Sequence, residues 1–345
     1  MYTKNLDYTK QILEKLLNIP SPSGYCNTIV EALGQEVKAL GYDYELTQKG
    51  NGLVTIEAQG NTEGGLLVSA HLDTLGAMVR SIKDNGKIRM TSVGGFTMNS
   101  IEGEYCKVHT RDGQVITGTI LNTSPSVHVY EDARTQERTE EVMEIRLDKD
   151  VSSKDDVKAL GIMVGDFVSF DPRVVFTEDG FIKSRHLDDK AGIATIMGAL
   201  KYIKENNIKL PRTTKFMFST YEEVGHGSSY IPEGIDTLLA IDMGAMGDDL
   251  TCSEKDVSIC VKDSSGPYDY NMVGKLIEIA EEQELDYALD VYPRYGSDAS
   301  AALRGGHNIK TALIGPGIHA SHTMERTHEN ALLGSLNLLI GYLQA

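Results

Sequence analysis

The sequence predicts an α/β fold in which a mixed, mostly parallel sheet is covered by helices and carries an inserted, small β-barrel-like domain. Helix-type and strand-type patterns alternate in residues 1–77 and again in residues 180–345. Between them, residues 78–179 contain short β-type runs separated by turn signals, and long helical stripes are nearly absent. A chain of 345 residues is long enough for two such domains, at about 150 residues each.

The N-terminal part of the main domain begins with two helices and two strands. Apolar residues recur at helical spacing in residues 7–17 and 29–40, and Gly41 ends the second helix. Residues 53–56 and 66–70 are predicted strands. The second strand is apolar on both faces, which is typical of a central strand in a sheet covered by helices.

The same patterns of apolar residues and turn signals predict the strands and helices of the inserted domain and of the C-terminal half. The insertion has five β-type runs, at residues 88–91, 114–121, 127–130, 142–147 and 167–170. After it, we expect helices at residues 189–206, 270–283 and 331–343 and strands at residues 215–220, 238–241 and 311–314. The return of alternating helices and strands predicts that one sheet is shared by both parts of the main domain.

The composition excludes several classes of protein. With 33 basic and 50 acidic residues the net charge is −17, which disfavours binding to nucleic acid. The longest apolar stretches fall well short of the ~18–20 residues of a membrane span, and no signal-type leader precedes residues 5–7. The four cysteines have no CxxC spacing, so we expect reduced thiols and a cytoplasmic location.

Side chains of the kinds that bind metals follow the predicted strands. They are His71 and Asp73, Glu222 and Glu223, Asp242, and the loop histidines His319, His322 and His328. Asp188 and Asp189 open the helix that follows the insertion. Because ligands of open parallel sheets bind beyond the carboxyl ends of the strands, these side chains are expected around one site.

Each of these motifs also has a purely structural interpretation. Residues 71–73 could be a polar loop start, and Asp188 or Asp189 could cap the following helix. Residues 222–223 could form a solvated loop, and His322 could lie on the surface. The order and placement of all five motifs together favour a functional site.

The motifs agree with a known family in sequence, order and spacing. They are SAHLDTLG (69–76), SRHLDDKAG (184–192), STYEEVGHGSS (219–229), AIDMG (240–244), RYGSDASA (294–301) and HASHTMERTHE (319–329). Over essentially its whole length, the chain resembles the tetrahedral aminopeptidases and glutamyl aminopeptidases, which are cocatalytic two-metal exopeptidases. The β-rich insertion between the first motif and the Asp-Asp pair fits the same family.

The resemblance implies a role for each matching residue. The implied metal ligands are His71 and Asp242 for one ion, Glu223 and His322 for the other, and Asp188 as the bridge. Glu222 matches the general base, and Asp73 matches the carboxylate partner of His71. In many relatives the last ligand histidine is followed by Ser or Thr and then by proline. This chain has Met324 there, so His319 remains an alternative to His322.

These roles imply a metal-dependent aminopeptidase that removes the N-terminal residue from short peptides. Two divalent ions ~3.5–4 Å apart need a shared anionic ligand, and they turn a bridging water into hydroxide near neutral pH. Glu222 would take the proton and return it to the leaving amine. Mixed His and carboxylate ligands suit two Zn²⁺ ions per chain, with Co²⁺ or Mn²⁺ as alternatives.

Other readings of the same residues stay open. The scaffold could hydrolyse a different amide, as a deacylase does, or could serve as a non-catalytic peptide-binding assembly protein. A glycosidase is disfavoured, because Glu222 and Glu223 would point to opposite sides of an extended strand. Residues 296–298 match the substrate-side loop of the family or form an ordinary turn, and Arg294 reads an acidic substrate or is a surface charge.

The resemblance also implies self-association. Family members form dimers and tetrahedral twelve-subunit shells, so we expect a dimer and a tetrahedral dodecamer. The inserted domain, residues 78–179, is then expected to serve dimerisation and assembly, whereas residues 1–77 and 180–345 form the catalytic domain.

Overall fold

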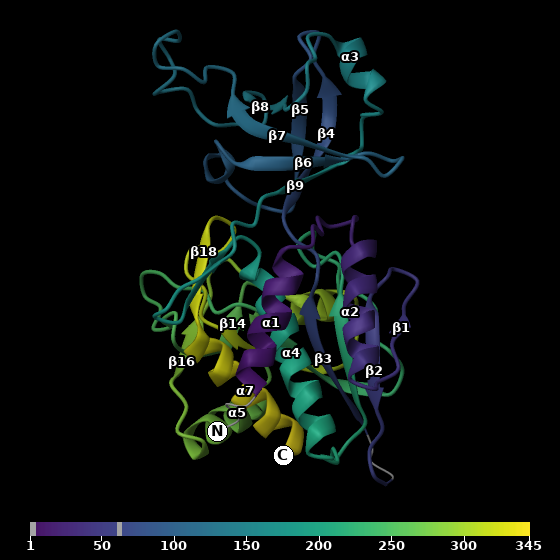
Figure 1. The fold of residues 1–345 in the computed structure, drawn as a ribbon. Helices are drawn as coiled ribbons and strands as arrows, with labels where there is room; N and C mark the ends of the chain where they lie inside the picture. Colours follow the sequence, from purple (N-terminus) through teal and green to yellow (C-terminus); the bar gives the residue numbers. More distant parts are fainter. Residues whose placement is uncertain (1–4, 61–63) are drawn as a thin grey trace.

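The computed structural model describes residues 5–60 and 64–345, which form an α/β body and a β-barrel (Figure 1). The barrel stands above the body in this view, and the chain passes from one to the other between β3 and α4. The α/β class predicted from the sequence is confirmed, as is the insertion of a small barrel. No helix of the described residues has the length and apolar character needed to cross a membrane.

The body is built on a mixed sheet of nine strands within the described residues. In spatial order the strands are β1 (Glu45–Leu46), β2 (Gly52–Ile56), β12 (Thr214–Ser219), β3 (Gly65–His71), β13 (Ile235–Ile241), β17 (Lys310–Pro316), β14 (Val257–Asp263) and β15 (Gly266–Pro267), with β16 (Tyr287–Val291) also paired to β14. The four central strands β12, β3, β13 and β17 are parallel, and the flanking β2 and β14 are antiparallel to them. The carboxyl ends of the central strands therefore meet at one edge.

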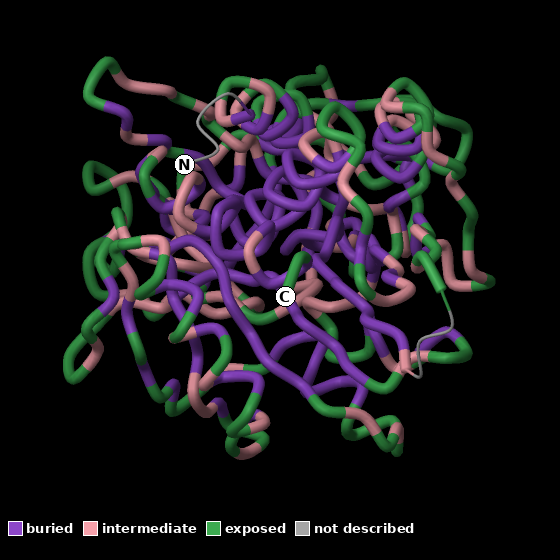
Figure 2. The backbone as a smooth tube through the Cα atoms, turned by 90° about the horizontal axis from the view of Figure 1, so that it is seen from below, coloured by how far each residue is buried: buried purple, intermediate pink, exposed green. Residues whose placement is uncertain are grey.

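Helices pack against this sheet. They are α1 (Leu6–Leu17), α2 (Asn27–Ala39), α4 (Leu187–Glu205), α5 (Tyr270–Glu282), α6 (Asp298–Arg304) and α7 (Glu329–Gln344). Helix α4 contacts β3 directly, with α1 and α7 packed beside it, and is buried continuously from Leu187 to Leu200. Gly198 permits the close approach of α1, since a Cβ there would lie 2.4 Å from Thr9 Oγ1. Figure 2 shows the buried segments gathered in the centre of the molecule and the exposed ones at its rim.

The barrel closes in the order β4-β5-β8-β7-β6-β9. Its elements are β4 (Gly76–Ile82), β5 (Ile88–Val93), the 3-10 turn η2 (Met98–Ile101), β6 (Tyr105–His109), β7 (Val115–Asn122), β8 (Met143–Leu147), the short helix α3 (Lys154–Ala159) and β9 (Phe167–Phe170). Ile88, Val108 and Ile145 are fully buried in a core that is separate from that of the body. The barrel thus has its own hydrophobic interior, as an independent folding unit does.

One predicted strand of the insertion is wrong. Residues 127–130 form a turn, with Val127 and Val129 56% and 73% exposed. The carbonyl of Ser126 accepts hydrogen bonds from the amides of Val129 and Tyr130, at 3.1 and 3.0 Å. This local hydrogen bonding takes the place of a strand ladder, so the β-type residues did not produce a strand.

A small sheet joins the end of the insertion to the last loop of the body. It consists of β10 (Val175–Phe176), β11 (Phe181–Ser184) and β18 (Glu325–His328), and the register places Ser184 opposite Glu325. Strand β10 lies within the residues assigned to the insertion but pairs here, beside the body. The division at residues 78–179 therefore stays a prediction. The pairing of β11 with β18 brings the start of α4 next to the loop that contains His322.

Candidate metal centre

The predicted site residues converge at the carboxyl edge of the parallel strands. His71 is the last residue of β3, and Asp242 follows β13 directly. Glu222 and Glu223 come three and four residues after the end of β12, and Asp188 lies at the start of α4. His322 lies in the loop between β17 and β18, so all of these segments meet beyond one sheet edge as the strand order requires.

Asp188 lies between two groups of side chains. Its Oδ1 is 3.3 Å from Nε2 of His71, and its Oδ2 is 3.4 Å from Nε2 of His322. A glutamate accompanies each histidine: Glu222 Oε2 is 3.7 Å from Nε2 of His71, and Glu223 Oε2 is 3.5 Å from Nε2 of His322. The two oxygens of one carboxylate thus face two different halves of a cluster.

Two sets of ligand-type atoms are compact enough to surround an ion. His71, Asp188 and Glu223 offer atoms that all lie within 4.8 Å of one another, and so do His71, Asp189 and Asp242. Asp242 is held by its Oδ1, which accepts a 2.7 Å hydrogen bond from the amide of Met243. The structure therefore brings together all five residues that the sequence singled out as ligands.

The ring of His71 is oriented by the main chain of Asp73. Nδ1 lies 2.8 Å from the carbonyl oxygen of Asp73 and 3.7 Å from its Oδ1, so the carbonyl is the nearer partner. With Nδ1–H donating to this carbonyl, the Nε2 lone pair faces the cluster. The Asp73 carboxylate instead accepts the amides of Glu222 and Glu223, at 3.0 and 3.3 Å, and the hydroxyl of Ser23.

The segment that carries Glu222 and Glu223 is a turn. Strand β12 ends at Ser219, and Tyr221 has a left-handed φ of 70°. Because the chain does not stay extended here, the two glutamates reach the same cluster at different histidines. The Asp73 carboxylate fixes this turn through the two amides that it accepts.

The two adjacent aspartates at the start of α4 have different partners. Asp189 accepts the amide of Gly192 at 3.1 Å, as a helix-capping residue does, and also the amide of His71 at 3.1 Å. Asp188 faces the two histidines and accepts the hydroxyl of Ser321 at 2.9 Å. Capping therefore accounts for Asp189 and does not account for Asp188.

The last loop presents His322, and not His319, to the cluster. His319 is exposed and is held by main-chain hydrogen bonds with Arg326. Nδ1 of His322 contacts the carbonyl oxygen of Gly95, in the segment after barrel strand β5, which leaves Nε2 toward Asp188 and Glu223. The side chain of His322 is 38% exposed, so this half of the cluster is open to the surroundings.

The sequence did not reveal the part played by Glu325. Its carboxylate is buried and accepts the amide of Asp188 on Oε2 and that of His322 on Oε1, both at 3.1 Å. Its position three residues after His322, within the last motif of the sequence, was the available signal.

The cluster concentrates carboxyl groups at one edge of the sheet. Six carboxylates gather there: Asp188, Asp189, Glu222, Glu223, Asp242 and Glu325. Within residues 5–60 and 64–345, none of the six forms an ion pair with a lysine or arginine. Burial of such a group of carboxylates is compensated by bound protons or by cations, and mixed imidazole and carboxylate donors suit divalent metals.

The pKa values of these groups reflect their crowding. Burial, assisted by neighbouring carboxylates, raises the pKa of Glu223 and of Asp242 to about 8, and raises that of Glu222 well above its usual range. Burial alone would lower the pKa of His322, but its hydrogen bond with Asp188 outweighs this and raises the pKa to about 10. Burial opposes ionisation of Asp188, yet hydrogen bonds with His322 and His71 lower its pKa.

A cavity of about 450 Å³ opens on the cluster. Arg294, Gly296 and Arg304 line it together with the carboxylates of Asp188, Glu222, Glu223 and Asp242. Neither arginine forms an ion pair with any residue that the structure describes. Of residues 296–298, Gly296 lines this cavity, whereas Ser297 caps α6 and Asp298, the first residue of that helix, accepts the hydroxyl of Ser219.

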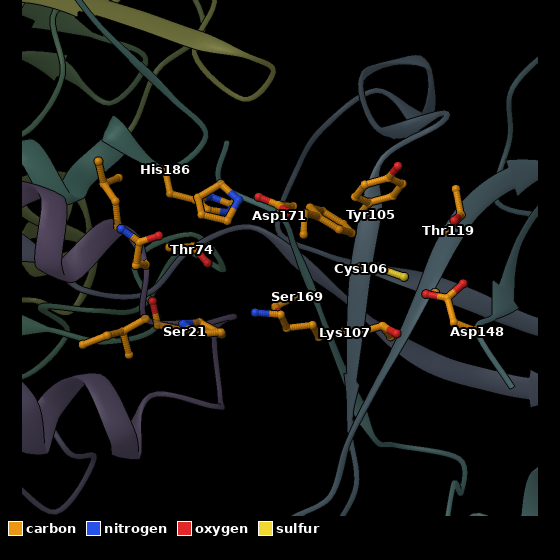
Figure 3. Close-up of a pocket in the computed structure, with 18 of the residues that line it drawn as sticks. Ser21, Thr74, Tyr105, Cys106, Lys107, Thr119, Asp148, Ser169, Asp171 and His186 are labelled. Atoms are coloured by element: carbon orange, nitrogen blue, oxygen red, sulfur yellow. The ribbon is translucent and has the colours of Figure 1, made fainter. Parts of the chain in front are cut away.

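A larger cavity, of about 590 Å³, lies between the barrel and the body (Figure 3). Ser21, Thr74 and His186 approach it from the body, and Lys107 and Asp148 approach it from the barrel. None of the predicted site residues lines this cavity, so its greater size does not indicate where the chemistry takes place.

Known proteins resemble this chain over nearly its full length. Residues 50–338 match the family described as M42 glutamyl aminopeptidase. The putative aminopeptidase YhfE of Bacillus subtilis (strain 168) is 48% identical over 338 residues, covering 98% of this chain and 97% of that protein. The glutamyl aminopeptidase of Lactococcus lactis subsp. cremoris is 25% identical, covering 62% of this chain and 59% of that protein.

Solved structures agree with this result. The TET1 peptidase of Pyrococcus horikoshii, described as assembling into a tetrahedron or a large octahedral shell, superimposes with a TM-score of 0.85 at 26% identity, over 97% of this chain and 99% of its own. PhTET1-12s, described as a dodecamer, gives a TM-score of 0.84 at 27% identity over 96% and 98%. Because the family match spans most of the sequence, the chain belongs to the M42 glutamyl aminopeptidase family and is a peptide-bond hydrolase of the aminopeptidase class.

Proposed function

We propose that the chain is a dinuclear metalloaminopeptidase that removes the N-terminal residue from short peptides. Peptidases of this family depend on metal ions, and the side chains at the sheet edge provide suitable donors. The observation that supports two ions is the placement of Asp188, whose two oxygens lie 3.3 and 3.4 Å from two different histidines. A shared carboxylate is what two close cations require.

Each half of the cluster would hold one ion. The proposed ligands are His71 and Asp242 in one half, Glu223 and His322 in the other, and Asp188 in both. When bound, two divalent ions polarise the scissile carbonyl and lower the pKa of the attacking water. The carboxylate and imidazole donors favour Zn²⁺, Co²⁺ or Mn²⁺, with Zn²⁺ as the ion that we propose.

Glu222 is the proposed general base. Its carboxylate lines the cavity beside His71, and its main chain is held by the Asp73 carboxylate. From this position it would remove the proton of the attacking water and deliver it to the leaving amine. Asp73 has no atom in the cavity, so its role is to position the Glu222 turn and the His71 ring.

A substrate panel tests this proposal. Metal-free protein would be reconstituted with Zn²⁺, Co²⁺ or Mn²⁺ and assayed on aminoacyl chromogenic substrates with free and with acetylated amines. We expect hydrolysis of the free amines and none of the acetylated ones. Preferential cleavage of acetylated substrates would instead show a deacylase, and well under one bound ion per chain at saturation would favour a non-catalytic binding protein.

We also propose that the chain self-associates into a dimer and a tetrahedral dodecamer. The shells formed by similar TET peptidases support this, as do exposed apolar residues on the barrel such as Tyr105, Val115 and Val129. Light scattering should give a multiple of the 37.8 kDa chain mass, and a value near the mass of one chain would contradict the proposal. Four buried, unpaired cysteines support the proposed cytoplasmic location.

A further inference from the structure

We propose that Glu325 is a positioning residue of the metal centre, whose carboxylate fixes the bridging Asp188 and the outer ligand His322 relative to each other. Oε2 accepts the amide of Asp188 and Oε1 accepts the amide of His322, both at 3.1 Å. The inference rests on the proposed function, because it assigns a purpose to Glu325 only if Asp188 and His322 are metal ligands.

The fold holds Glu325 firmly in place. It is the first residue of β18, where it pairs with Ser184 of β11, and its residue is 2% exposed. One residue further on, Arg326 and His319 exchange main-chain hydrogen bonds of 2.8 and 3.1 Å. These bonds close the loop that carries His322, so Glu325 stands at the base of the loop and beside the start of α4.

Both amides that Glu325 accepts belong to irregular backbone. His322 has a left-handed φ of 64°, a conformation that residues with a side chain rarely adopt. Asp188 departs from helical geometry, with φ −75° and ψ 103°. Such conformations persist where surrounding contacts impose them, and a hydrogen bond from each amide to a fixed carboxylate is a contact of that kind.

The bridge requires two acceptors, and a carboxylate provides them. Each oxygen of Glu325 receives one N–H. A glutamine in the same place would keep one acceptor and turn its NH₂ group toward the other amide, where two donors would meet. Glu325 forms no ion pair with a lysine or arginine in the described part of the chain, so a purely electrostatic surface role does not account for it.

The same arrangement occurs twice more around the cluster. The Asp73 carboxylate accepts the amides of Glu222 and Glu223, and the Asp189 carboxylate accepts the amide of His71. With Glu325, buried carboxylates therefore hold the amides of nearly every ligand-bearing segment. Partners of this kind typically contribute 10–100-fold to metal affinity when they orient ligands.

The test compares Glu325→Gln with the matched control Glu254→Gln, which removes a carboxylate that contacts Arg326 outside the cluster. Metal-free protein would be titrated with Zn²⁺ by calorimetry, and its Tm would be measured with and without Zn²⁺. For Glu325→Gln we expect a 10–100-fold weaker affinity for at least one ion, and therefore a smaller Zn²⁺-dependent rise in Tm than in the wild type. The control should bind like the wild type.

Two results for Glu325→Gln would overturn the inference. One is a Zn²⁺ affinity equal to that of the wild type. The other is a loss of Tm that is equal with and without Zn²⁺, because that would show a merely structural role. If wild-type protein itself binds no Zn²⁺, the proposed function fails first, and the failure is visible without any variant. If Glu325→Gln does not fold, Glu325→Asp, which keeps both acceptors at a shorter reach, should bind with intermediate affinity, and unchanged affinity would refute the proposal.

Discussion

Buried carboxylates are compensated differently in the barrel and in the body. In the barrel, Glu144 is 3% exposed and contacts the amines of Lys83, at 2.7 Å, and Lys87. At the sheet edge of the body, six carboxylates gather around His71 and His322. No lysine or arginine among residues 5–60 and 64–345 forms an ion pair with any of those six.

This difference separates carboxylates that lysines of the same chain compensate from carboxylates that have no such partner. A buried charge is tolerated when a partner and hydrogen bonds compensate for the lost hydration. The barrel supplies such partners from its own lysines, so its charges are structural. The body supplies no such partner to its six carboxylates within the described residues, so the stability of variants there should depend on added metal, whereas the stability of barrel variants should not.

The largest effect is expected for Glu222→Gln in the body. Loss of a general base lowers kcat by about 10²–10⁴-fold, while the proposed ligands remain intact and Zn²⁺ titration is unchanged. The measurement is kcat on an aminoacyl substrate, with Glu233→Gln at the surface as the control. A near-wild-type rate in Glu222→Gln would remove this residue from the mechanism.

Asp188→Asn tests the bridge between the two halves. In wild-type protein, Zn²⁺ at 100 times its Kd should add about 2.7 kcal/mol of stability, and a chelator should reverse the gain. Asparagine offers one oxygen and no charge, so we expect most of this Zn²⁺-dependent rise in Tm to disappear. Thermal melts with and without Zn²⁺ decide the matter, and a full rise in the variant would contradict the shared-ligand arrangement.

Glu144→Gln is the corresponding change in the barrel. It removes the charged acceptor from Lys83 and Lys87 and should cost about 1.5–3 kcal/mol, because hydrogen bonds to charged groups are worth roughly that much. The loss of Tm should be the same with and without Zn²⁺, and kcat should not change. If the loss depended on Zn²⁺, the barrel and body would not be electrostatically independent.

The smallest effect concerns pH and His109 of the barrel. Burial lowers the pKa of His109 to about 4, whereas in the unfolded chain it lies near 6.5. As the pH falls from 6.5 to 4 the unfolded state takes up a proton that the folded state does not, so stability is lost across this window and levels off below it. In metal-free protein, Tm should therefore fall less over this range in His109→Gln than in the wild type. An identical fall in both proteins would show that His109 does not contribute.

The sequence was sufficient to locate the site because of a general property of parallel sheets. His71, Asp242 and the Glu222–Glu223 pair each follow an apolar strand, and parallel strands bring such residues to one edge. Asp188 and His322 were found through the family motifs. Residues up to about 250 positions apart in the sequence can thus be assigned to one cluster from the sequence.

The features that the sequence did not predict depend on contacts between residues far apart in the chain or on hydrogen bonds of the main chain. Glu325 acts through two main-chain amides, and no residue pattern shows which amides a carboxylate will meet. Strands β14 and β16 were missed because their pairing depends on neighbours across the sheet. Residues 127–130, which were wrongly predicted as a strand, have strand-type side chains, but the amides of Val129 and Tyr130 donate to the carbonyl of Ser126.

The antiparallel pairing of Ala77 with Val168 has a consequence for how the body assembles. A flexible loop of about 115 residues between β3 and α4 would cost roughly 4 kcal/mol in closure entropy. The barrel begins with β4 and ends with β9, which pair with each other. Once the barrel has folded, its two ends are therefore as close together as the ends of a short hairpin. The body can therefore carry a whole extra domain in its chain at little more entropic cost than a turn.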